Sequence, residues 1–93
     1  MGLYAIPIRD DEAAAEIPAV LRSHGYAVFF EREDASARYY VCEGGRRPLH
    51  FWITMGTPRR FSIGAGRRGR GVVDVLSRHG VFAEDGGAGA GPQ

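Results

Sequence analysis

The sequence predicts a single small α+β domain, in which a four- to five-stranded, mostly antiparallel sheet carries two helices on one face. The chain has 93 residues, enough for one hydrophobic core. Short apolar runs alternate with period two between turn residues, as antiparallel strands do. Two other segments carry apolar residues at helical spacing and end in His-Gly. The expected element order is β-α-β-β-β-β-α.

The first expected strand covers residues 3–8, where apolar side chains alternate and Pro7 indicates a sheet edge or a strand end. A helix follows, because Asp10 or Asp11 can cap its first turn and apolar residues then recur at helical spacing. Gly25 ends this helix in the left-handed conformation that glycine favours.

Further strands are expected where β-type runs lie between turn residues, namely over residues 26–32, 38–42, 49–55 and 60–63. A Gly-rich loop leads from the last strand into a second, shorter helix over residues 72–79, and residues 81–82 form a short edge strand or pack on the core. The domain is expected to cover residues 1–84. The Gly/Ala-rich segment 85–93 is expected to be a disordered tail.

Plain antiparallel hairpins with these turns decide which side chains share a face of the sheet. The predicted register places Phe30, Val41, Phe51 and Ile63 together on the core face. The opposite face then carries Phe29, Glu31, Tyr40, Cys42, His50, Trp52, Thr54, Arg60 and Ser62. Because two helices cover only one face, we expect this second face to meet water, unless another part of the chain or a second subunit covers it.

Arginine supplies all twelve basic residues, and seven of them lie between Glu43 and Asp74 in a stretch without an acidic residue. The formal net charge is only +1, so the segregation of charge matters more than its sum. Arginine neutralises phosphate, and aromatic rings stack on bases. We therefore predict that the protein binds a polyanion without enzymatic activity, and that RNA or DNA is the preferred polyanion. The predicted binding residues are Arg46, Arg47, Arg59, Arg60, Arg67, Arg68, Arg70, Trp52, Tyr40 and His50.

The near-neutral net charge leaves a second function class open, a small protein-binding regulator or inhibitor such as a phage-type inhibitor of a nucleic-acid machine. The arginines would then pair with acidic residues of the target, and Trp52 would be the anchor of the interface. A homodimer through the second sheet face is compatible with either function.

Residues 64–69, Gly-Ala-Gly-Arg-Arg-Gly, match the G-x-G-x-x-G pattern between a strand and a helix. The second strand–helix–strand unit of a dinucleotide-binding domain is missing, and a phosphate site on free backbone amides beside three arginines is the alternative. Cys42 and His50 are expected to be cross-strand neighbours, but no acidic residue is placed to orient them for nucleophilic catalysis. We expect no enzyme activity, no cofactor and no metal site.

The two helix ends, residues 21–26 (LRSHGY) and 75–80 (VLSRHG), resemble those of the small HicA-type toxins, which have a double-stranded-RNA-binding-domain-like fold and cut mRNA. The catalytic histidine of that family would fall within residues 30–41, where this chain has none. Its activity is therefore not carried over, and RNA cleavage stays a third, weaker function class.

Cys42 is the single cysteine, so the chain forms no internal disulfide, and a reducing compartment such as the cytoplasm is expected. No apolar stretch approaches the roughly 18 residues that a membrane-spanning helix needs, so no membrane partner is expected.

Overall fold

The computed structural model describes residues 2–43 and 45–83, so the tail expected over residues 85–93 lies outside the described part. Its helices and strands follow in the predicted β-α-β-β-β-β-α order, which confirms the α+β fold class. They are β1 (Leu3–Pro7), α1 (Asp11–Ser23), β2 (Phe29–Glu33), β3 (Ala37–Glu43), β4 (Leu49–Thr54), β5 (Arg60–Gly64) and α2 (Arg67–Arg78).

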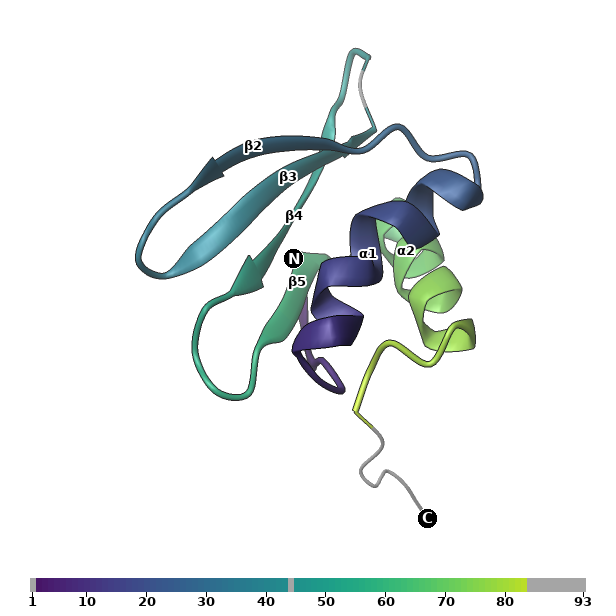
Figure 1. The fold of residues 1–93 in the computed structure, drawn as a ribbon. Helices are drawn as coiled ribbons and strands as arrows, with labels where there is room; N and C mark the ends of the chain where they lie inside the picture. The colour runs from purple at the N-terminus through teal and green to yellow at the C-terminus, as the bar shows by residue number, and fades with distance from the viewer. Residues whose placement is uncertain (1, 44, 84–93) are drawn as a thin grey trace.

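One five-stranded sheet forms the framework, with all neighbours antiparallel in the order β1-β5-β4-β3-β2. The N-terminal strand thus lies beside the last strand, and β2 forms the opposite edge. Residues 81–82 form no strand of the sheet, although Phe82 makes an isolated bridge to Ile8. Figure 1 shows both helices on one side of the sheet, which leaves its other face without a covering layer among the described residues.

Helix α1 begins and ends at the residues that the sequence indicates. The Asp10 side chain accepts a hydrogen bond from the Ala13 amide at 2.8 Å, so Asp10 is the N-cap. Gly25 follows the helix with a φ of 91°, a conformation that costs glycine little. Ile17 and Leu21 are fully buried on the side that faces the sheet.

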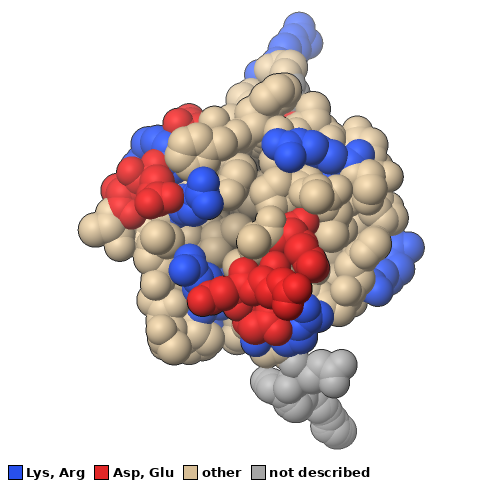
Figure 2. All heavy atoms as spheres, in the orientation of Figure 1, with Lys and Arg blue, Asp and Glu red and all other residues tan. Residues whose placement is uncertain are grey.

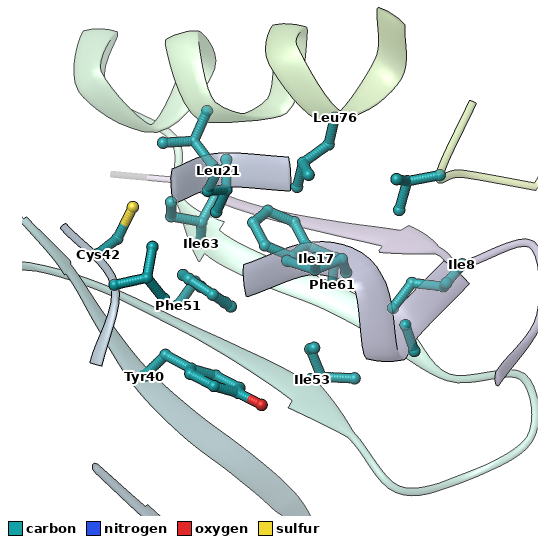
Figure 3. Packing of buried hydrophobic residues seen from close by; sticks show 14 of the residues in the cluster. Ile8, Ile17, Leu21, Tyr40, Cys42, Phe51, Ile53, Phe61, Ile63 and Leu76 are labelled. Carbon is teal, nitrogen blue, oxygen red and sulfur yellow. The ribbon is translucent and has the colours of Figure 1, made fainter. Parts of the chain in front are cut away.

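The core is built from aromatic rings on three neighbouring strands beneath aliphatic side chains of both helices (Figure 3). Tyr40 of β3 stacks on Phe51 of β4 with ring centroids 4.9 Å apart, and Phe51 lies 5.1 Å from Phe61 of β5. Leu21 of α1 and Leu76 of α2 are both completely buried above this row. The strands and helices are therefore held together by one continuous hydrophobic core.

The predicted register is right for one hairpin and wrong for β3. Phe51 pairs with Ile63 as expected, but its partner on β3 is Tyr40 and not Val41. Tyr40 and Cys42 consequently lie buried in the core, whereas Val41 pairs with His50 on the open face.

Two register shifts cause this error. Between Phe30 and Arg32 of β2, and again between Val41 and Glu43 of β3, the pairing skips one residue, which is the mark of a β-bulge. A bulge inserts one extra residue into one strand, and a slip of one residue exchanges the two faces. Counting from the turns alone could not find either insertion.

Helix α2 begins at Arg67, earlier than the predicted start at residue 72, so part of the expected Gly-rich loop is helical. The reason lies in the packing of Gly69, which is buried against the end of β5. A Cβ atom at this position would lie 1.9 Å from the carbonyl oxygen of Gly64. Two glycines in the first turns lower the helix propensity of this segment, but only glycine permits the close approach.

We predict that Gly69→Ala and Gly71→Ala change stability in opposite directions. The added methyl group at Gly69 forces helix and strand apart and should lower the free energy of unfolding by about 1–3 kcal/mol. At Gly71 it meets only the Tyr26 hydroxyl at 3.5 Å, an ordinary contact. Gly71→Ala should therefore raise stability by up to about 1 kcal/mol through helix propensity. Urea denaturation measures both, and equal effects would refute the packing role of Gly69.

Candidate functional site

Five of the seven clustered arginines lie at one end of the sheet. Strand β4 begins where β5 ends, because Phe51 pairs with Ile63, so the loop before β4 and the helix after β5 are brought to the same end. We call this the arginine end, and its arginines are Arg46, Arg47, Arg67, Arg68 and Arg70. All five are exposed.

Arg68 connects the two segments of the arginine end. Its Nη1 donates to the Arg47 carbonyl oxygen at 2.8 Å, and its Nη2 donates to Glu43 Oε1 at 2.9 Å. Its charge is therefore already partly neutralised. The side chains of Arg46, Arg47 and Arg67 form no ion pair with any residue in the ranges 2–43 and 45–83. These three guanidinium groups are available to a partner.

The first turn of α2 is electrostatically unfavourable as it stands. Its N-cap is Gly66, which makes no side-chain hydrogen bond, and the turn contains no acidic residue. Arg67, Arg68 and Arg70 instead place positive charge at the positive end of the helix dipole. An anion bound here would meet both the unpaired backbone amides and the guanidinium groups.

The remaining two arginines lie at the other end of the sheet, so the stretch does not form one surface. Arg59 pairs with Asp11 at 2.8 Å and contacts the Met55 sulfur at 3.5 Å. Arg60 is exposed on β5 opposite Pro7. Figure 2 shows arginine atoms at the tip of the projecting hairpin, while acidic atoms gather over the start of α1 and near the β2 edge. Arg59 and Arg60 therefore lie apart from the arginine end, although the sequence-based prediction grouped them with its residues.

The open face of the sheet carries a row of stacked groups across three strands. Tyr39 of β3 stacks on Trp52 of β4 with ring centroids 6.3 Å apart. The guanidinium carbon of Arg32 lies 3.8 Å from the Tyr39 ring centroid, which is a cation–π contact. Trp52 is half-buried on this face, and Phe29 of the edge strand β2, which pairs with Val41, is 60% exposed.

Tyr40 does not belong to this row, although the predicted register places it there. The bulge in β3 turns Tyr40 into the core, where it is 7% exposed, and puts Tyr39 beside Trp52 instead. Tyr39 and Arg32 were missed for the same reason. A sequence signal existed, because Tyr39 and Tyr40 are adjacent and one of them must face each way.

His50 is exposed on the open face, and its Nδ1 lies 3.6 Å from Glu31 Oε1. Cys42 is buried on the other face, so the expected Cys42–His50 neighbourhood is wrong. Burial disfavours the thiolate and raises the pKa of Cys42 to about 11. A thiol in this state is a poor nucleophile.

Among the glycines of residues 64–69, Gly69 serves the packing of a helix on a strand. Strands β4 and β5 are antiparallel, so the parallel strand–helix–strand unit of a dinucleotide site is not formed among the described residues. Gly69 permits the helix to pack closely on the strand. The last glycine of the dinucleotide-binding motif has the same role.

Two further searches are confined to the described ranges 2–43 and 45–83. They contain no group of three or more His, Cys, Asp and Glu side chains that could hold a metal ion. None of their helices is long and apolar enough to cross a membrane. Comparison of the chain with protein-family models, curated proteins and solved structures finds no match.

We predict that the buried thiol of Cys42 makes the protein less stable at alkaline pH. Above about pH 9 the unfolded chain loses the thiol proton, whereas the folded chain keeps it until about pH 11. The unfolded state then binds fewer protons, so stability falls as pH rises through this window, by up to about 2–3 kcal/mol. Urea denaturation between pH 8 and 11 should show this fall.

Cys42→Ala is the control, because it removes the titrating thiol and keeps the other groups. Tyr26, whose pKa burial also raises, is present in both proteins. The variant should lose less stability than the wild type over the same pH range. Identical pH profiles would show that Cys42 does not titrate as its burial requires.

Proposed function

We propose that the chain is a non-enzymatic binding protein that engages the phosphate groups of a nucleic acid through the arginine end. One observation carries this proposal: two segments distant in sequence bring five arginines to one end of the sheet. The acidic residues paired with them are Glu43 and Asp74, on Arg68 and Arg70. The end therefore keeps a positive excess, which attracts a polyanion.

The shape of this end favours an extended ligand over a small anion. Arg46 and Arg47 lie in the loop between β3 and β4, which projects from the body of the protein (Figure 1), whereas Arg67 and Arg70 lie on α2. Their charges are spread over two separate elements. A chain of successive phosphates can meet all of these charges at once.

The open face supplies the second part of a single-strand site. Alternate residues of β4 point to this face, so His50 and then Trp52 follow the arginine loop in a line along the strand. Trp52 is stacked with Tyr39, and such rings can stack on bases at about 1–3 kcal/mol per base. A single strand held by the arginine end would thus pass over the aromatic row, which makes single-stranded RNA or DNA the preferred ligand.

A protein partner is the second candidate, because the same face exposes apolar side chains. Leu3 of β1 is 54% exposed and Phe29 of β2 is 60% exposed, at the two edges of the sheet, with Trp52 between them. Exposed apolar groups around an aromatic anchor are typical of a protein interface. A regulator or inhibitor would use Trp52 as the centre of that interface.

We predict that mixed-sequence single-stranded RNA and DNA bind in the micromolar range at about 50 mM salt. Fluorescence anisotropy over a range of salt concentrations measures the affinity and its salt slope. Arg46→Ala/Arg47→Ala/Arg67→Ala removes three phosphate contacts and should lower the slope by about 2, since each contact contributes about 0.7 for a single strand. Arg68 is retained because it connects helix and hairpin.

The charge-matched control is Arg38→Ala/Arg60→Ala/Arg78→Ala, which also removes three positive charges but none from the arginine end. It should keep most of the slope of the wild type. Equal losses in the two variants would show an unspecific charge effect. Absence of micromolar binding by the wild type would overturn the nucleic-acid proposal in favour of a protein partner.

A further inference from the structure

The C-terminal ends of both helices bring two histidines into contact at the surface. His24 is the C-cap of α1 and His79 is the C-cap of α2, and both residues are exposed. Their Nε2 atoms lie 2.9 Å apart, and their rings meet edge to face at 87°. These histidines are 55 residues apart in the chain, so the fold and not local sequence places them together.

Both histidines are fixed by the same backbone motif. The amides that follow His24, those of Gly25 and Tyr26, donate to the carbonyl oxygens of Arg22 and Leu21 at 3.0 and 3.1 Å. This pair of bonds is the Schellman motif. The amides of Gly80 and Val81 donate to Ser77 and Leu76 in the same way, at 3.0 and 3.2 Å.

Each motif is anchored in the core. Leu21 and Leu76 each lie one turn before the histidine, and both are completely buried. The similarity between residues 21–26 and 75–80 therefore reflects the same capping motif at the ends of both helices. The two ends bring the two imidazole rings into contact. The neighbouring guanidinium groups of Arg22 and Arg78 donate to the carbonyl oxygens of Val28 and Asp74.

We propose that His24 and His79 form a two-histidine chelate for a divalent transition metal ion. The site should bind Cu²⁺ more tightly than Ni²⁺. Imidazole nitrogen is a favoured ligand of these ions, and Cu²⁺ binds most tightly in the first-row series. Water molecules complete the coordination. The negative ends of two helix dipoles point at the site, which favours a cation.

The distance between the ring nitrogens is close to that between two neighbouring ligands of one metal ion. With metal–nitrogen bonds of about 2.0–2.1 Å, a separation of 2.9 Å subtends an angle of about 90° at the metal. That is the angle between neighbouring ligands in square-planar, tetragonal and octahedral complexes, which Cu²⁺ and Ni²⁺ adopt. A tetrahedral Zn²⁺ site would need the nitrogens about 3.3 Å apart.

Binding requires only movements that exposed rings can make. In the hydrogen-bonded pair one Nε2 donates its proton to the other. Chelation needs both Nε2 lone pairs, so the donor ring shifts to the tautomer with its proton on Nδ1. Both rings then turn about their broad χ2 torsions until the lone pairs meet at the metal.

The test is a Cu²⁺ titration of the full chain without a histidine tag, followed by calorimetry and electron paramagnetic resonance. We expect one ion per chain and the nitrogen hyperfine pattern of two imidazoles. His24→Ala and His79→Ala should each weaken binding by at least about tenfold, because even the loss of a residue that only supports a metal ligand weakens binding by that much. The double variant should bind little more weakly than either single variant, because either change destroys the chelate.

His50→Ala is the matched control, since His50 is the third histidine of the chain and is also exposed. It should bind Cu²⁺ as the wild type does. Cu²⁺ should also raise the melting temperature of the wild type and of His50→Ala, but not of His24→Ala. An equal loss of affinity in all three single variants would overturn the proposal. Tighter binding of Zn²⁺ than of Cu²⁺ would overturn the assignment of the site to Cu²⁺.

Discussion

The structure depends on the close approach of α2 to the end of β5 at Gly69. The backbone of this residue lies where no side chain would fit, directly over the Gly64 carbonyl group. This contact sets how the first turn of α2 sits beside the β3–β4 hairpin, where Arg68 reaches the Arg47 carbonyl. Because a helix is rigid, it also determines where its other end brings His79 to His24. One small residue thus positions both ends of α2.

Sequence reasoning succeeded where a local rule decides the structure. Asp10 caps α1 because its side chain can bind a nearby amide, and the glycines after His24 and His79 take the left-handed conformation. The hairpin of β4 and β5 has the expected register because its strands pair without a bulge. These features need no knowledge of the remaining fold.

Sequence reasoning failed where a contact distant in the chain decides. The bulge in β3 exchanged Tyr39 and Tyr40 between the faces, although Trp52 was placed correctly. Helix α2 began early because tertiary packing of Gly69 overrides its poor helix propensity. The charge stretch was read as one surface, but β4 and β5 carry Arg59 and Arg60 to the other end of the sheet. The contact between His24 and His79 had no signal beyond the similar helix ends.

The bulge in β2 lies in the free edge strand of the sheet. All five residues of this edge strand are exposed, and Phe29 and Phe30 place a ring on each face. A regular strand of this kind would offer a template on which other chains could extend the sheet into fibrils. The extra residue near Glu31 interrupts the spacing of the free edge, and alternating charges at Glu31, Arg32 and Glu33 resist burial. The irregularity that obscured the register thus also interrupts the pairing edge that carries the exposed aromatic rings.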